Sequence, residues 1–206
     1  MTRRSLRVIK PEIRVLGIDD GKFTPHSKDQ VLVVGVVFRA GLWLEGIMHT
    51  ALTVDEFDAT EKIADMIINS PHHQQLRVIL LNGITFAGFN IVDIKNLNLL
   101  AHLPVIAVTN KKPNLARVQK ALEKLPNSEE RWKAVLSAGR IIPVTTRSEN
   151  QEIYMEIAGI LEQTAKEVLK LTSIRSNIPE ALRVAHLIAS GLTPDCSPKL
   201  LRYEKV

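Results

Sequence analysis

Two polar residues stand where apolar runs of similar composition end. Asp19 directly follows the run at 14–18, and Asn82 directly follows the run at 77–81. If these runs are neighbouring parallel strands, both side chains emerge at the carboxyl edge of the sheet, where open α/β sheets bind ligands. Carboxylate and amide oxygens that converge there could hold Mg²⁺ or Mn²⁺. Turn chemistry is the alternative, because Asp-Gly and Asn-Gly pairs commonly follow strands without any ligand.

A histidine near the end of the sequence is a third candidate. His186 stands on a predicted helix, one turn after Leu182 and three residues before Ala189, so it faces partly toward an apolar side. It is either a hydrogen-bonded core histidine or a catalytic group. Arg183 lies on nearly the same side of this helix, where it could contact a phosphate or pair with Glu180.

The remaining acidic and histidine clusters have structural explanations. Asp55, Asp58 and Glu61 crowd the first turns of a predicted helix, where carboxylates interact favourably with the helix dipole. His72 and His73 precede a predicted strand, but no cysteine or second histidine pair stands at the spacing of a zinc site. The sequence lacks the phosphate-binding loop, the dinucleotide glycine motif and the nucleophilic serine elbow, which disfavours the enzyme classes built on them.

The elements that must position these side chains follow from the apolar pattern. Apolar runs bounded by turn residues predict six strands, at 13–18, 31–38, 42–50, 78–81, 105–108 and 141–144. The short link at 39–41 predicts a hairpin between the second and third strands. A helix within 89–100 would connect the fourth and fifth strands, which predicts that these two strands are parallel.

Capping signals predict further helices. Thr53-x-x-Glu56 has the form of a capping box and predicts a helix to about residue 69, while Ser148-x-x-Gln151 predicts another. Helical spacing gives the first helix an inner face of Phe57, Ile63 or Ala64, and Ile67, and gives the second Ile153, Ile157, Ile160 and Val168. Shorter helices are expected at 115–125 and 129–138. The last helix has Pro179 near its first turn and Gly191 just beyond its end.

The composition bounds the class of protein. The chain has 206 residues, 45% hydrophobic and 24% charged, which suits one α/β domain over 1–206 with a mixed sheet and helices on both faces. The net charge of +5 is compatible with a phosphate-rich partner, although a merely soluble basic protein would have the same balance. Cys196 is the single cysteine, so no internal disulfide can form. Because no segment is long and apolar enough to cross a membrane, we expect a cytoplasmic protein.

Four segments carry a resemblance that goes beyond spacing. They are 17–19 (Gly-Ile-Asp), 81–90 (Leu-Asn-Gly-Ile-Thr-Phe-Ala-Gly-Phe-Asn), 103–109 (Leu-Pro-Val-Ile-Ala-Val-Thr) and 179–186 (Pro-Glu-Ala-Leu-Arg-Val-Ala-His). From about residue 14 to residue 191, the chain resembles the mainly archaeal, endonuclease V-related family called endonuclease dU. The resemblance implies a ribonuclease-H-like fold of the endonuclease V type, a divalent metal, and nicking of nucleic acid near a deaminated base.

The resemblance also implies roles for individual residues. Asp19 matches the first metal aspartate of endonuclease V, and His186 matches a histidine near its metal site. Asn82 stands where endonuclease V has a second metal aspartate. Because an amide offers one carbonyl oxygen and no negative charge, metal affinity should be lower than with aspartate. Asp58 is the candidate for the remaining acidic ligand, and Asp55 is the alternative.

Three functional hypotheses follow. The first is a metal-dependent endonuclease that uses Mg²⁺ or Mn²⁺ on DNA, in preference to RNA, containing uracil or hypoxanthine. Phe86 and Phe89 would then be wedge residues for a base that leaves the stack, although both could equally be core. Arg183, Lys111 and Lys112 would contact phosphates. The second hypothesis is a weak or inactive nucleic-acid-binding relative that has lost a metal ligand at Asn82, and the third is a protein that retains only the fold.

Overall fold

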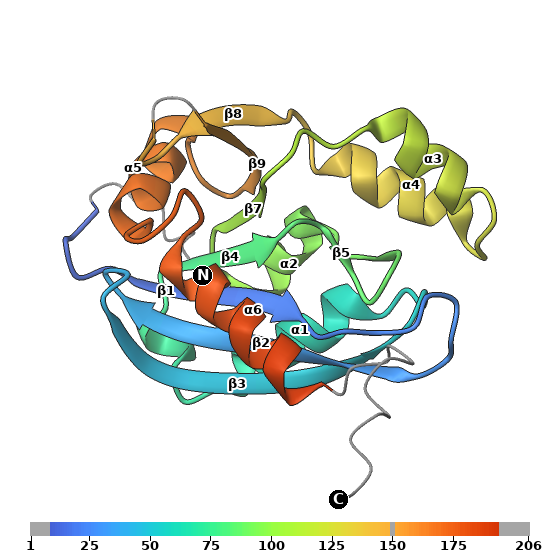
Figure 1. Cartoon of the computed structure of the whole chain (residues 1–206), viewed down its shortest axis with the longest axis horizontal. Helices are drawn as coiled ribbons and strands as arrows, with labels where there is room; N and C mark the ends of the chain where they lie inside the picture. The colour runs from blue at the N-terminus through green and yellow to red at the C-terminus, as the bar shows by residue number, and fades with distance from the viewer. Residues whose placement is uncertain (1–8, 149–150, 194–206) are drawn as a thin grey trace, which may run out of the picture.

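The computed structural model describes residues 9–148 and 151–193, so Cys196 lies outside the described residues. Seven strands form one sheet in the order β3-β2-β1-β4-β7-β9-β8 (Figure 1). The strands are β1 Arg14–Asp20, β2 Gln30–Arg39, β3 Trp43–Thr53, β4 Val78–Asn82, β7 Val105–Thr109, β8 Ile142–Thr145 and β9 Glu152–Ala158. No helix within the described ranges is long and apolar enough to cross a membrane.

The sheet is mixed, and its parallel centre agrees with the sequence-based expectation. β2 and β3 form the predicted antiparallel hairpin, and β2 also pairs antiparallel with β1. β1, β4 and β7 are parallel, whereas β9 runs antiparallel to both β7 and β8. The register pairs Ile18 with Leu81, so the residues that follow them leave β1 and β4 at the same edge.

Helices cover both faces of the sheet, as predicted. α1 (Ala59–Ile68), α2 (Ile94–Ala101) and α4 (Ser128–Ser137) contribute to the core on one face, and α5 (Glu162–Thr172) and α6 (Glu180–Leu192) to the core on the other. Because successive side chains of a strand point to opposite faces, Leu16 and Ile18 belong to the first core and Val15 to the second. The remaining helix, α3 (Leu115–Leu122), follows β7 and projects with α4 to one side of the sheet (Figure 1).

One glycine allows α6 to lie directly on β1. A Cβ atom at Gly17 would be 2.3 Å from the backbone carbon of Ala181 in α6. No real Cβ contact is that short, so any other residue at this position would force the helix and the strand apart. The missing side chain therefore fixes how closely the last helix approaches the first strand.

The first capping box does not begin a helix. Thr53 is the last residue of β3 and still pairs with Gln30 of β2, and a turn follows in which Asp55 has a positive φ of 56°. α1 begins only at Ala59. Its predicted inner face is nevertheless present, because Ile63, Ala64 and Ile67 are buried and Phe57 packs partly buried against the same core.

The second capping box is also wrong, and the segment after it is a strand. β9 occupies Glu152–Ala158, and α5 starts ten residues later than β9, at Glu162. The spacing of four between Ile153 and Ile157 fits a helix and a strand equally, because four is a multiple of the strand period of two. Buried Met155 between them belongs to the same core and follows the strand period. In addition, Gly191 lies within α6 and not beyond its end.

The helix expected within 89–100 is present as α2 (Ile94–Ala101), but a short hairpin that the sequence did not predict precedes it. β5 (Thr85–Phe86) and β6 (Asn90–Ile91) pair antiparallel, and α2 begins only at Ile94. The hairpin turns at Ala87 and Gly88, which both have positive φ values, of 43° and 87°. The loop between the paired residues Phe86 and Asn90 therefore has three residues, and a positive φ is unusual for an alanine.

The contact between α6 and β1 gives a direct test of packing. Gly17→Ala should lower the free energy of unfolding by about 2 kcal/mol or more, because the added methyl overlaps the backbone of Ala181. Gly191→Ala in the same helix is the matched control, since nothing lies within 4 Å of its added Cβ. That control should gain about 0.5–1 kcal/mol from helix propensity. Urea denaturation measures both, and equal stabilities of the two variants would refute this account of the packing.

Candidate functional site at the carboxyl edge of the sheet

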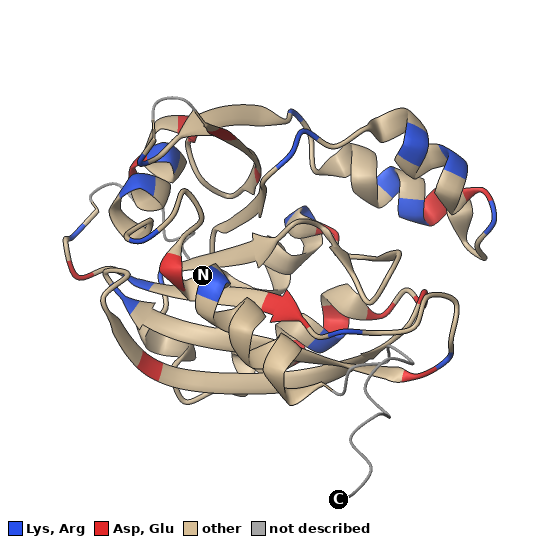
Figure 2. Cartoon of the chain, viewed as in Figure 1, with Lys and Arg blue, Asp and Glu red and all other residues tan. Residues whose placement is uncertain are grey.

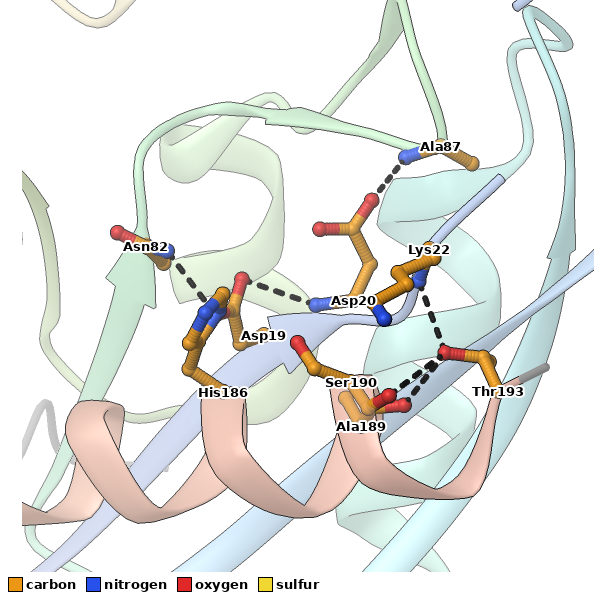
Figure 3. A network of polar contacts seen from close by, with 9 residues as sticks. All are labelled: Asp19, Asp20, Lys22, Asn82, Ala87, His186, Ala189, Ser190 and Thr193. Atoms are coloured by element: carbon orange, nitrogen blue, oxygen red, sulfur yellow. Dashed lines mark hydrogen bonds and ion pairs between the residues drawn. The ribbon is translucent and has the colours of Figure 1, made fainter. Parts of the chain in front are cut away.

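Asp19 and Asn82 meet at the carboxyl edge of the parallel strands, as predicted. Nδ2 of Asn82 donates a hydrogen bond to Oδ2 of Asp19 at 3.0 Å (Figure 3). The backbone N–H of Asp20 donates to the other oxygen, Oδ1, at 2.9 Å. Asp19 is 2% exposed, whereas Asn82 is exposed at the end of its strand. The site therefore has a buried carboxylate with an amide at its open side.

α6 brings His186 to the same carboxylate. Nδ1 of His186 lies 2.8 Å from Oδ2 of Asp19, and the imidazole side chain is 60% exposed. This exposure excludes the alternative of a core histidine enclosed by aliphatic groups. With Asp19 ionised, Nδ1 donates to it, and this hydrogen bond orients the ring so that Nε2 is left to accept or donate elsewhere.

Asp20 is a second acid of the site that the sequence-based interpretation had treated only as part of a turn. Its Oδ2 accepts a hydrogen bond from the backbone N–H of Ala87, at the tip of the β5–β6 hairpin, at 2.6 Å. Asp19 and Asp20 therefore point to opposite faces of β1, one toward α6 and the other toward the hairpin (Figure 3). Two adjacent acids at the end of a buried strand were the signal in the sequence that could have identified this pair.

Burial shifts the titration of both acids. It raises the pKa of Asp19 above its usual range, and the hydrogen bonds from Asn82, the Asp20 N–H and His186 only partly oppose this effect. Burial likewise raises the pKa of Asp20 to about 6, where the Ala87 N–H opposes the shift and the charge of Asp19 adds to it. Ionisation of either acid therefore costs free energy in the folded protein, and a cation at this edge would reduce that cost.

Asp58 and Asp55, the acids expected to complete the site, have other partners. Asp58 accepts from Nδ2 of Asn90 at 2.7 Å and pairs with Lys62. Asp55 accepts from the backbone N–H of Phe89 at 2.9 Å. No hydrogen bond or ion pair between described residues joins either acid to Asp19. Both instead organise the start of α1 and its contact with the hairpin.

The two predicted wedge residues lie on the hairpin but differ in burial. Phe86 is fully buried and belongs to the core, so its ring is not presented to a ligand in this arrangement. Phe89 is only partly buried and packs against the same core. The core alternative, which the sequence left open, therefore describes Phe86, and Phe89 alone keeps an accessible surface.

The basic residues predicted to contact phosphates differ in whether another side chain already engages them. Arg183 donates to both carboxylate oxygens of Glu180, so its guanidinium group already has an anionic partner. Lys111 and Lys112 are exposed in the segment that follows β7. Since β7 pairs with β4 next to Asn82, these two lysines leave the sheet at the same edge as the site.

The donor chemistry suits a hard divalent cation, although no cage is preformed. Within residues 9–148 and 151–193, no three His, Cys, Asp or Glu side chains are already grouped as metal ligands. Asp19 nevertheless places a buried carboxylate on the α6 face of β1, and Asp20 places a partly buried one on the hairpin face. Among the described ion pairs, only His186 partners Asp19 and none partners Asp20. Oxygen ligands with uncompensated negative charge are what Mg²⁺ and Mn²⁺ prefer.

The raised pKa of Asp20 predicts a pH-dependent stability. Because its pKa is higher in the folded state than the ordinary 3.8, the folded state binds more protons, and stability falls as the pH rises from about 4 through 6. Asp20→Asn keeps an oxygen for the Ala87 N–H and removes the charge. In EDTA it should stabilise the protein at pH 7.5 by up to about 3 kcal/mol and have little effect at pH 4. Urea denaturation at both pH values tests this, and a loss of stability at pH 7.5 would contradict it.

Comparisons with known proteins support a family assignment. The family model for Endonuclease dU matches residues 11–193. A UPF0215 protein from Methanopyrus kandleri is 52% identical over 188 residues, which cover 91% of this chain and 95% of the relative. A crystal structure of a protein of unknown function from Archaeoglobus fulgidus is similar with a TM-score of 0.78 and 36% identity, over 87% of this chain and 98% of that one.

Structures of endonuclease V are similar at lower identity. The enzyme from Bacillus subtilis gives a TM-score of 0.61 at 12% identity and covers 90% of this chain and 84% of its own. Ciona intestinalis endonuclease V, solved in complex with DNA containing an inosine, gives 0.54 at 14% identity, over 84% of this chain and 83% of its own. At these identities the likeness shows the fold, which is the ribonuclease-H-like α/β fold of endonuclease V. By the family match over most of its length and by its relatives, this chain belongs to the Endonuclease dU family.

Proposed function

We propose that this protein is a metal-dependent endonuclease that nicks DNA containing deaminated bases. One observation carries the proposal: a buried aspartate, Asp19, bonds both Asn82 and His186 at the carboxyl edge of an endonuclease V-like sheet. Membership of the Endonuclease dU family supports nuclease chemistry. The inosine-containing DNA bound by the Ciona intestinalis enzyme supports a deaminated base as the target.

Asp19 and the carbonyl oxygen of Asn82 would hold the metal ion, and Asp20, on the opposite face of β1, would add negative charge nearby. For Asn82 this requires rotation of its amide, because the nitrogen now faces Asp19. Asp58 is left out of this assignment, since it is engaged by Asn90 and Lys62. Once bound, Mg²⁺ or Mn²⁺ would supply Lewis-acid stabilisation of charge on the phosphate and lower the pKa of a water molecule.

His186 has the arrangement of an oriented acid or base. Its Nδ1 is held by the buried carboxylate of Asp19, and the rest of the ring is open to solvent. A ring fixed in this way can present Nε2 to a phosphate oxygen or to the leaving oxygen of a broken phosphodiester. His186 would therefore hold or move a proton at the scissile bond, while Asp19 fixes the orientation of its ring.

Recognition of a deaminated base would take place beside the hairpin. A base inside a duplex must leave the stack before an enzyme can distinguish it. The tip of the β5–β6 hairpin lies next to Asp20 through the hydrogen bond from Ala87, and Phe89, in the turn before β6, is its accessible aromatic residue. Phe89 is therefore the aromatic side chain that would stack on a displaced or neighbouring base.

Asn82 favours a second candidate function, binding without cleavage. The amide donates a hydrogen bond to Asp19, which an ionised aspartate at that position could not do. A relative that had replaced a metal ligand by this hydrogen bond would keep its nucleic-acid surface and lose its catalytic charge. Binding of DNA in the absence of any nicking would identify this function.

The proposed activity is tested with labelled single- and double-stranded DNA carrying one deoxyuridine or one deoxyinosine. Native protein should nick these strands near the altered base with Mg²⁺ or Mn²⁺, and not with EDTA. His186→Ala should reduce the rate by about 10²-fold or more, the usual contribution of a positioned acid or base. Its melting temperature should change little, since the ring is mostly exposed. No nicking under any of these conditions would contradict the proposal.

Asn82→Asp separates a weak nuclease from an inactive relative. The new carboxylate would replace an amide whose nitrogen is 3.0 Å from Asp19, so repulsion should lower the melting temperature in EDTA. Mn²⁺ binds the folded site and should recover this loss. In a weak nuclease the substitution should also raise the nicking rate. If neither the native protein nor Asn82→Asp gains melting temperature with Mn²⁺, the metal site is refuted.

A further inference from the structure

The excess positive charge of the chain is concentrated in one segment. Residues 111–140 contain eight Lys or Arg and three Asp or Glu, a net charge of +5 that equals the net charge of the whole chain. The rest of the sequence is therefore electrically balanced. We call this segment, with α3, α4 and their flanking turns, the α3–α4 lobe. Figure 2 shows Lys and Arg on both of its helices and on the segment that leads to α3 from β7.

Most of this charge is exposed and available. Only Arg131 is buried, and Arg140 forms an ion pair with Glu162. The others are exposed and form no ion pair with any described residue: Lys111, Lys112, Arg117, Lys120, Lys124 and Lys133. Unpaired cations held close together repel one another, so a surface of this kind is best stabilised by an anionic ligand.

Three of these side chains form a stripe along α3. Arg117 and Lys120 lie in the helix and Lys124 in the turn behind it, at the i, i+3, i+7 spacing of one helix face. In α3 only Leu122 is buried, so the helix contributes little to the core. A helix with one buried residue and a row of cations on its outer side is suited to an extended polyanion.

The lobe begins at the edge of the sheet that carries the candidate site. β7 pairs with β4 through Val108 and Asn82, and the N–H of Gly83 donates to the Val108 carbonyl at 2.9 Å. Lys111 and Lys112 follow within a few residues. A strand of nucleic acid whose phosphate lies at Asp19 could therefore continue over these lysines to the stripe on α3.

A buried arginine fixes the lobe in place. Arg131 of α4 is fully buried, and its guanidinium donates to the carbonyls of Asp55, Glu56 and Phe89 at 2.7, 2.8 and 2.5 Å. Its Nε donates to the carbonyl of Pro126 within the lobe at 2.8 Å. The lobe is thus bound to the hairpin whose tip contacts Asp20, which gives its cations a defined position relative to the site.

We propose that the α3–α4 lobe binds the sugar-phosphate backbone of the nucleic acid on one side of the cleavage site. This assignment rests on the proposed function, because it takes the ligand to be the strand that enters that site. The lobe supplies sequence-independent, salt-sensitive affinity through phosphate contacts. The hairpin and His186 act on the base and on the scissile phosphate.

The test compares two triple variants of the full chain with equal charge changes. The lobe variant carries Arg117→Gln, Lys120→Gln and Lys124→Gln, and glutamine preserves helix propensity. The control variant carries Lys10→Gln, Arg77→Gln and Lys170→Gln. Lys10 and Arg77 lie near the amino ends of β1 and β4, at the opposite edge of the sheet, and Lys170 belongs to α5. The probe is a fluorescent 24-nucleotide single strand with one deoxyinosine, in EDTA, followed by anisotropy at several salt concentrations.

The lobe variant should bind about tenfold or more weakly near 0.1 M salt, and the slope of log affinity against log salt should fall by roughly 2, for three lost phosphate contacts. The control variant should bind within about twofold of the native protein. The inference is overturned if the lobe variant binds like the native protein, if both variants weaken equally, or if the lobe binds phosphatidylserine vesicles and not DNA. Nicking by the native protein is measured in a separate experiment, with Asp19→Ala as the inactive control. If DNA binds through the lobe but the native protein does not nick it, the proposed function is refuted and this inference is not.

Discussion

The close approach of α6 to β1 is the constraint on which the site depends. Where Gly17 has no side chain, the backbone of Ala181 fills its place, and the helix lies against the strand. This contact fixes where along β1 the side chain of His186 projects, because His186 follows Ala181 by five residues on α6. Its Nδ1 then meets Asp19, two residues beyond Gly17 on the same face of β1. The geometry of the polar site is thus determined by a steric condition within the apolar core.

Folding removes the two acids at the end of β1 from water, although their ionised forms are better solvated there. Asp19 and Asp20 face opposite sides of one strand, so α6 serves one carboxylate and the β5–β6 hairpin serves the other. Each is partly satisfied by neutral hydrogen-bond donors, yet burial still raises the pKa of both. An edge that buries carboxylates without a lysine or arginine partner among the described residues gains from a cation. The basic residues are gathered instead on the α3–α4 lobe, where a phosphate backbone would meet them.

The sequence predicted the centre of the fold and of the site better than their surroundings. The meeting of Asp19 and Asn82 was predictable because strand ends determine where such side chains emerge, whereas the choice of a site role for them and for His186 needed the family resemblance. Asp20 was missed because its direction depends on the strand continuing for one more residue, and its partner is a backbone N–H on a hairpin with little periodicity. β9 was taken for a helix because its isoleucines are four residues apart. Both capping boxes failed because neither strand pairing nor tertiary contacts can be recognised in a four-residue pattern.

Binding of Mn²⁺ to the native protein, measured as the loss of the free-ion electron paramagnetic resonance signal on titration, tests the central claim most directly. The account predicts one saturable site per chain that is lost in Asp19→Ala. The site should be kept in Gly191→Ala, because Gly191 lies on α6 and nothing lies within 4 Å of its added Cβ. Saturable binding that survives Asp19→Ala, or no binding by the native protein, would contradict the claim that this edge of the sheet is a metal site.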